Sequence, residues 1–208
     1  LMFTVSADQY QQQLADKVAR VEALYAPFSA PPVQVAASPE LGYRMRAEFR
    51  LWHEDDDLYY AMFAKDDPKT PLRIEEFPIA CERIQTAMPL LRQALIASPE
   101  LRRKIFQVEF LATLSGELLI SLVYHRPLAD AWTQAAAPLQ QLLQASIVGR
   151  SRKQKVTLSS DFLNEELTIN GRMYHYRQYE QAFTQPNAVV NCAMISWACA
   201  QAQDLGGD

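Results

Sequence analysis

The stretch YRMRAEFRLW, residues 43–52, constrains the fold more than any other part of the chain, because its apolar and charged residues alternate. Side chains of a β-strand point alternately to its two faces, so this pattern predicts a strand with one buried side. The buried side is formed by Tyr43, Met45, Ala47, Phe49 and Leu51. The other side carries Arg44, Arg46, Glu48 and Arg50 and is mainly cationic. We therefore expect a sheet with one covered face and one open, charged face.

The rest of the chain combines helical and strand patterns. Apolar residues spaced three or four apart predict helices over residues 7–28, 79–97, 128–145 and 187–203. Strands are predicted over residues 58–63, 72–77, 105–114, 117–125, 147–150, 156–162, 167–170 and 172–178. Asn170-Gly171 is the strongest hairpin signal. This order predicts an α+β fold in which helices pack on an antiparallel sheet.

One junction is unusually short. The stretch QQLLQASIVGR, residues 140–150, passes from a helical to a strand pattern with almost no connecting residues. Such connections usually take about 2 to 6 residues. The pattern therefore predicts either that residues are missing between Ala145 and Ser146 or that the chain makes a very tight turn there.

The distribution of charge is more informative than its sum. The 208 residues carry a net charge of −4, which by itself argues against a polyanionic partner. The two signs are nevertheless segregated, and basic residues gather at 44–50, 102–104 and 150–155. A single basic run is usually a solvated face, whereas three runs at strand or loop positions favour a nucleic-acid surface. The third run contains Arg150, Arg152 and Lys153.

Several other classes of function lack their sequence signals. Cys81, Cys192 and Cys199 form no C-x-x-C pair, so we expect neither a disulfide framework nor a metal site. No apolar stretch reaches the roughly 18 to 20 residues of a membrane span, and no signal-peptide pattern is present, so a cytoplasmic protein is expected. Catalytic motifs of metalloproteases, P-loop proteins and serine hydrolases are also missing. A self-contained active site is not expected.

Two rings leave a structural and a functional interpretation open. Phe106 alternates with Val108 and Phe110, which is typical of a core residue. It also follows the cations at 102–104. An aromatic ring next to cations is a common way to stack an unpaired base beside a positively charged groove, which is the functional interpretation. His125 lies at a strand end and is either a surface residue or a stacking or phosphate-contacting group.

The segment FTQPN, residues 183–187, precedes the last predicted helix. Pro186 is expected in the first helical turn, with Thr184 or Gln185 at the start of the helix. The structural interpretation is helix capping. The functional interpretation is that the Gln185 amide, which both donates and accepts hydrogen bonds, contacts a base edge or a cofactor. After the helix, DLGGD at residues 204–208 is typical of the lead-in to a nucleotide-binding strand and turn.

The segments YRMRAEFRLWH, IFQVEFLATLS, SLVYH and YRQYEQAFTQPNAVVN together resemble the bacterial tRNA (uracil-5-)-methyltransferases. The pattern F-x-Q-x-N is common to the wider RNA uracil-5 methyltransferase family, whereas YRMRAEFR and FTQPNA narrow the resemblance to the tRNA branch. The resemblance covers nearly the whole chain. It implies an RNA-recognition domain over residues 1–180. Residues 181–208 are then the linker and first helix of a Rossmann-like domain that binds S-adenosylmethionine.

The resemblance also implies an activity, the formation of 5-methyluridine (ribothymidine) in the tRNA T-loop. In this family a cysteine attacks the uracil ring, the activated ring takes the methyl group, and a glutamate-type base removes a proton. Cys81, Cys192 and Cys199 do not match the motif of that nucleophile. We therefore assign no catalytic residue here. The family's Gly-rich cofactor loop is also missing, so the chain by itself is expected to be inactive.

Site residues follow from the same resemblance. Gln185 matches the glutamine that borders the cofactor and the target base, in one motif with Phe183 and Asn187. Phe106 and His125 match residues that stack in the opened T-loop and expose the target uridine, a form of base flipping. The partner implied is the tRNA T-arm.

Charged residues complete the expected RNA surface. Glu48 and Arg50 match a charged pair on the RNA-facing strand of the family, and the remaining cations expected to contact RNA are Arg44, Arg46, Arg150, Arg152 and Lys153. The sequence departs from the family's pattern by about five fewer residues before IVGR, at the short junction near Ser146.

Two other interpretations remain open at the level of sequence. The chain is either a complete, non-enzymatic RNA- or protein-binding module, or an α+β domain whose basic patches are only structural. The coding sequence after Asp208 distinguishes the complete binding module from the enzyme. A stop codon would indicate the module, and a Gly-rich strand and turn followed by a Pro-Cys motif would indicate the enzyme. The second interpretation predicts no RNA affinity at any salt concentration.

Overall fold

The alternating stretch forms an inner strand of the main sheet. In the computed structural model, which describes residues 7–203, this strand is β1 (Arg46–Glu54). Ala47, Phe49 and Leu51 are buried, whereas Glu48 and Arg50 are exposed, so the predicted alternation is confirmed. Strand β1 pairs with its hairpin partner on one side and with a strand from the middle of the chain on the other. One face of β1 is therefore covered and the other is open.

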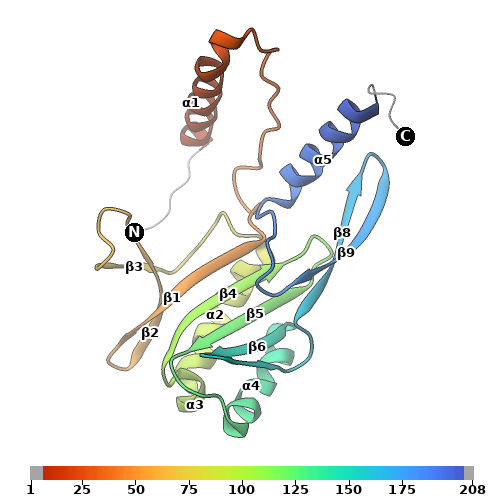
Figure 1. Ribbon diagram of the computed structural model, residues 1–208. Coiled ribbons are helices and arrows are strands. Elements are labelled where there is room, and N and C mark those ends of the chain that lie inside the picture. Colours follow the sequence, from red (N-terminus) through yellow and green to blue (C-terminus); the bar gives the residue numbers. More distant parts are fainter. Residues whose placement is uncertain (1–6, 204–208) are drawn as a thin grey trace.

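Seven strands form the main sheet in the order β3-β2-β1-β4-β5-β6-β7 (Figure 1). The other six strands of this sheet are β2 (Asp57–Phe63), β3 (Pro71–Ile74), β4 (Ile105–Ala112), β5 (Leu118–Tyr124), β6 (Ser146–Ser151) and β7 (Gln154–Thr157). All neighbours are antiparallel except β5 and β6, which are parallel. The expected α+β class is confirmed, but purely antiparallel pairing was wrong at this one place, because helix α4 (Asp130–Leu143) connects β5 to β6.

Three helices cover one face of the sheet and create the core. They are α2 (Glu82–Ala97), α3 (Pro99–Arg102) and α4 (Figure 1). The rings of Phe49, Tyr60, Phe77 and Phe110 meet there, with centroid distances of 5.1 to 6.3 Å. The Tyr60 hydroxyl donates to the Met88 carbonyl oxygen at 2.7 Å, so the sheet and α2 also share a buried polar contact.

The short junction after α4 is a tight turn. Gln144 adopts a left-handed backbone with φ of 46°, and the Ala145 N–H donates to the Gln140 carbonyl at 3.1 Å. A left-handed residue is a common way to end a helix, here without glycine. Strand β6 then begins at Ser146. The connection between α4 and β6 is therefore a very tight turn.

A separate two-stranded ribbon follows β7. It consists of β8 (Phe162–Ile169) and β9 (Arg172–Tyr179), and the predicted turn at Asn170-Gly171 is confirmed with positive φ at both residues. The sequence predicted strands over residues 156–162 and 167–170 and left 163–166 unassigned; the structure instead has one strand, β8, whose alternate residues are buried. Leu163 joins Leu111, Leu119 and Val148 in a small apolar cluster on the open face of the sheet.

Helices at the two ends of the described chain lie beside this body. Helix α1 (Ala7–Tyr25) is followed by a 3-10 turn, η1 (Ala26–Phe28), and helix α5 (Ala188–Gln203) follows the ribbon (Figure 1). Tyr10 of α1 donates its hydroxyl to the Ser38 carbonyl at 2.7 Å. Residues 204–208, with the DLGGD pattern, lie outside the described residues. No helix within residues 7–203 is long and apolar enough to cross a membrane.

Glu180 ties the end of β9 to the main sheet. Its side chain is 2% exposed, accepts hydrogen bonds from the Arg150 guanidinium and from Ser121 Oγ at 3.0 Å, and lies 3.5 Å from Lys155 Nζ. Burial alone would raise the pKa of Glu180, but the hydrogen bonds from Arg150 and Ser121 and the two positive charges outweigh it and lower the pKa. The carboxylate is therefore a charged structural group.

We predict that Gly149→Ala destabilises the fold. A Cβ atom at Gly149 would lie 2.4 Å from the indole of Trp132 and 2.7 Å from Leu128 Cδ1, and both side chains belong to the core. Overpacking of this kind costs about 1–3 kcal/mol. Urea unfolding should show this loss for Gly149→Ala and almost none for Ala137→Ser on the exposed side of α4. Equal stability of the two variants would contradict the packing.

We also predict that Glu180→Gln makes the unfolding free energy depend less on pH between pH 7 and pH 3. The pKa of Glu180 is lowered in the folded state, so its contribution is complete above the unfolded pKa near 4.5 and is lost as pH falls through the folded value. The difference in unfolding free energy between wild type and variant should therefore shrink from pH 7 to pH 3. A difference that stays constant over that range would show that Glu180 does not titrate as described.

Candidate nucleic-acid interface

The open face of the sheet carries a connected row of polar side chains. Arg50 Nη1 donates to Gln107 Oε1 at 3.0 Å, and Gln107 Nε2 donates to Glu109 Oε1 at 3.0 Å. Arg46 Nη2 lies 3.3 Å from Glu109 Oε2 and completes the row. Glu48 stands directly opposite Glu109 on the neighbouring strand and is exposed. The sequence predicted the charges of β1 on this face but not the two β4 residues that link them.

Phe106 and His125 lie stacked on each other beside this row. Their ring centroids are 3.6 Å apart and the planes are 9° from parallel. The Arg50 guanidinium lies 5.4 Å from the Phe106 centroid. Simple alternation placed Phe106 with Val108 and Phe110 in the core, and this was wrong because a bulge between Ile105 and Gln107 shifts the register of β4. The bulge turns Phe106 toward His125.

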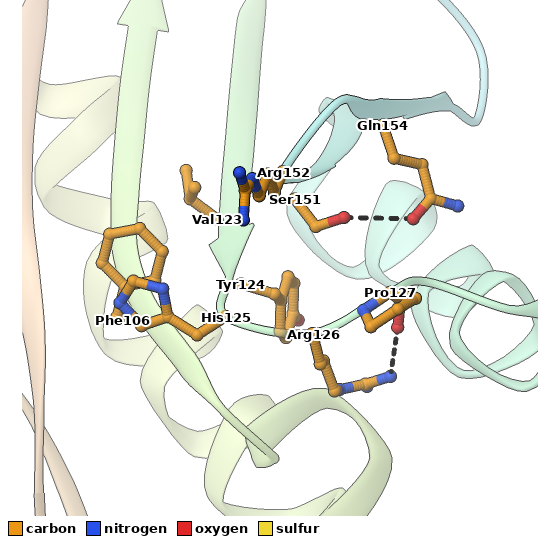
Figure 2. A pocket seen from close by; sticks show the side chains of 9 residues that line it. All are labelled: Phe106, Val123, Tyr124, His125, Arg126, Pro127, Ser151, Arg152 and Gln154. Carbon is orange, nitrogen blue, oxygen red and sulfur yellow. Dashed lines mark hydrogen bonds between the residues drawn. The ribbon is translucent and has the colours of Figure 1, made fainter.

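The stacked pair forms one wall of a pocket of about 660 Å³ (Figure 2). The pocket is lined by Phe106, Val123, Tyr124, His125, Arg126, Pro127, Ser151, Arg152 and Gln154. Gln154 is held by two hydrogen bonds to the backbone of Leu128. Its Oε1 accepts from the Leu128 N–H at 2.8 Å, and its Nε2 donates to the Leu128 carbonyl oxygen at 2.6 Å. Arg126 is also fixed, by Glu100 Oε1 at 2.7 Å. Arg152 is exposed at the rim, so the pocket combines rings with an accessible cation.

The three basic runs divide into structural and accessible cations. Arg102 donates to the carbonyls of residues 55–57 and holds the β1–β2 turn, and Arg150 pairs with the buried Glu180. Arg152 and Lys153, in the turn between β6 and β7, are both exposed. The predicted RNA contact of Arg150 thus falls on a residue that already has a buried partner, whereas its two neighbours are open to solvent.

The other predicted residues lie at the opposite end of β1. Arg46 Nη1 donates to the Ala182 carbonyl at 2.9 Å, and the Met45 N–H donates to the Pro186 carbonyl at 2.7 Å. Phe183 between them is 83% exposed. Gln185 is half-buried. Arg44 lies here too, where its backbone bridges Asn187, so it is remote from the stacked rings.

Asn187 caps the last helix. Its Oδ1 accepts the Val190 N–H at 3.0 Å, and its Nδ2 donates to Ser38 Oγ at 2.6 Å. The sequence placed Thr184 or Gln185 at the start of the helix and Pro186 in its first turn. The structure corrects this, because α5 begins at Ala188 and an asparagine is among the best capping residues. The side chain of Gln185 is not used as a cap.

The three cysteines differ in their exposure to solvent, from buried Cys81 to exposed Cys199. Burial raises the pKa of Cys81, and it also raises the pKa of Cys192. Cys199 is exposed near the end of α5. Within residues 7–203 no group of His, Cys, Asp or Glu side chains is arranged to hold a metal ion.

Comparison with known proteins gives a consistent family. Residues 9–208 match the model of the family described as tRNA (Uracil-5-)-methyltransferase. The chain is 51% identical over 200 residues to the tRNA/tmRNA (uracil-C(5))-methyltransferase of Aromatoleum aromaticum, covering 96% of this chain and 54% of that protein. The protein of the same description from Vibrio cholerae is 48% identical over 209 residues, covering 98% of this chain and 56% of its own length.

Similarity of this extent decides the family and leaves part of each relative unmatched. A third relative, from Dechloromonas aromatica, is 50% identical over 99% of this chain and 57% of its own length. The chain spans about half the length of the curated relatives it matches. The match to the family model extends over nearly all of the 208 residues. The chain therefore belongs to the tRNA (uracil-5-)-methyltransferase family.

Proposed function

We propose that this chain is the tRNA-binding portion of a methyltransferase that makes 5-methyluridine in the T-loop. Family membership supports the reaction class, since the relatives are described as tRNA/tmRNA (uracil-C(5))-methyltransferases. Residues 1–180 are then the RNA-recognition unit, and residues 181–208 lead into the methyltransferase domain. The enzyme would meet its tRNA in the cytoplasm.

The observation that supports this function best is the ring pair beside accessible cations. Phe106 and His125 stack at 3.6 Å, Arg50 lies over Phe106, and Arg152 lies at the rim of the same pocket. Single-stranded RNA is recognised in this way, with unstacked bases on rings and phosphates on cations. Each ring offers a surface for a base of the T-loop, so stacking there would help to hold the loop open and the target uridine extruded.

The residues of this chain bind and orient RNA in the proposal and perform no bond-making step. Arg50, Arg152 and Lys153 attract phosphates, and the rings of Phe106 and His125 take bases. Arg150 is excluded from direct contact because its charge is committed to Glu180. The family's cysteine nucleophile and proton-abstracting base are not assigned to any residue here, because none of Cys81, Cys192 and Cys199 matches the motif of that nucleophile.

S-Adenosylmethionine is the methyl donor in this proposal. Gln185 is the residue assigned to its edge: the side chain is half-buried and its amide has no hydrogen-bond partner among residues 7–203. A free amide that donates and accepts fits such a contact. One amide cannot enclose a molecule of this size, so Gln185 would supply a single contact to it.

We predict that Phe106→Ala and His125→Ala each weaken binding of a T-arm hairpin RNA by about 5- to 100-fold, because base stacking contributes about 1–3 kcal/mol. Filter binding at low salt measures the effect. Phe28→Ala is the matched control, since Phe28 is an exposed ring after α1. Affinity that is unchanged in both pocket variants would leave these rings a structural role. Equal affinity of the wild type for an unrelated hairpin would count against T-arm recognition.

We predict a second difference, between Arg152 and Arg150. Arg152→Gln should lower the slope of log affinity against log salt by about 0.7–0.9, as expected for one lost phosphate contact. Arg150→Gln should leave that slope unchanged and instead lower the unfolding free energy, since it leaves Glu180 without its main partner. A reduced slope for Arg150→Gln with normal stability would reverse the assignment of the two arginines.

A further inference from the structure

We propose that Glu109 is a positioning residue that couples the stacked rings to the segment from Gln181 to Asn187. The inference rests on the proposed function, because it concerns how an RNA bound at the rings would affect the loop that carries Phe183 and Gln185. Glu109 touches neither end itself. It is bound directly to Arg46, which contacts the segment, and through Gln107 to Arg50, which lies beside the rings.

The connection is a continuous chain of hydrogen bonds across β1 and β4. It begins at Arg50, beside the Phe106 ring, and passes to Gln107 at 3.0 Å and on to Glu109 Oε1 at 3.0 Å. From Glu109 Oε2 it continues to Arg46 Nη2 at 3.3 Å, and Arg46 Nη1 donates to the Ala182 carbonyl at 2.9 Å. Each carboxylate oxygen of Glu109 therefore faces one end of the chain.

The position of this carboxylate is costly for stability alone. Glu109 is directly opposite Glu48 in the β1–β4 pair, and like charges in that arrangement are destabilising. Its side chain is only 13% exposed, whereas Glu48 is open to solvent, which screens part of the repulsion. The compensation comes from Arg46, whose guanidinium fork binds Glu109 and the Ala182 carbonyl at once. A neutral side chain at 109 would avoid the repulsion but would lose this fork.

The backbone position of the segment after β9 depends on the Arg46 guanidinium, which binds it between two other points of attachment to the sheet. Glu180 fixes its beginning through Arg150 and Ser121, and Pro186 fixes its end through the Met45 N–H. The hydrogen bond from Arg46 to Ala182 lies between these two points, next to the exposed Phe183. A base stacked on Phe106 and a phosphate on Arg50 would order one end of the chain. Restricting the motion of Arg50 would in turn restrict Gln107, Glu109, Arg46 and the Ala182 backbone. RNA binding at the rings would thus be coupled to the position of the segment 181–187.

Hydrogen exchange of the backbone amides at 181–187 in the 208-residue chain tests this coupling. Without RNA, Glu109→Gln should speed exchange of this segment by about 2- to 10-fold, as expected for one weakened hydrogen bond. Saturating T-arm hairpin RNA should slow exchange of the segment in wild type and leave it unchanged in Glu109→Gln. Glu109→Asp, which keeps the charge, should restore part of the RNA effect.

Glu117→Gln is the matched control. Glu117 is also a partly buried carboxylate with two partners, the Asn164 backbone N–H at 2.7 Å and its amide at 3.3 Å. Its loss should affect exchange near Asn164 and not at 181–187. Thermal unfolding of each variant verifies that exchange is measured on folded protein.

Three outcomes would overturn parts of the argument separately. RNA protection of 181–187 that persists in Glu109→Gln would mean that RNA contacts the segment directly, and the coupling would be wrong. Equal exchange of wild type and Glu109→Gln without RNA would show that Glu109 does not position the segment. Failure of wild type to bind the T-arm hairpin would contradict the proposed function, while the comparison without RNA would still decide the positioning role.

Discussion

The bulge at the start of β4 is the local feature on which the candidate site depends. With regular alternation, Phe106 would point the same way as Val108 and enter the core. The shifted register between Ile105 and Gln107 keeps Ile105 buried and turns the next ring to the open face. There it meets His125, whose backbone N–H donates to the Lys104 carbonyl at 2.9 Å. A single extra residue thus creates a platform that the helices do not cover.

The arginines of this chain serve two physically different purposes. Arg102, Arg126 and Arg150 satisfy backbone carbonyls or buried carboxylates, and their forked guanidinium groups suit those contacts. Cations in the β6–β7 turn are exposed and suited to a polyanion. This division explains how a chain with net charge −4 can present a cationic rim. Local accessibility, rather than the sum of charges, decides whether a phosphate is attracted.

Much of this fold could be predicted from the sequence, because its strongest signals are local. The alternation of β1 and the turn at Asn170-Gly171 both follow from backbone geometry at adjacent residues. The parallel pairing of β5 with β6 could not be predicted in this way, since it joins residues separated by a whole helix. The assignment of Asn187 as the cap was missed because three polar or proline residues precede it and each offers a plausible start.

The candidate site was less predictable than the fold for a related reason. The resemblance to the family supplied Phe106 and His125, but residue patterns alone gave no sign that their rings stack on each other. Their stacking depends on a bulge that changes the register of one strand. The partners of Arg150 and Arg46 were equally hidden, because Glu180 and Ala182 lie 30 and 136 residues away in sequence.

These long-range contacts have a common consequence for the segment that follows β9. Glu180, Ala182 and Pro186 are all bound to the main sheet, so Phe183 and Gln185 are carried by a backbone that the sheet fixes at several points. The order of this segment therefore depends on Arg46, Ser121, Arg150 and the Met45 backbone of the main sheet as well as on its own sequence. A change in the sheet that leaves the motif FTQPN intact can still displace its side chains.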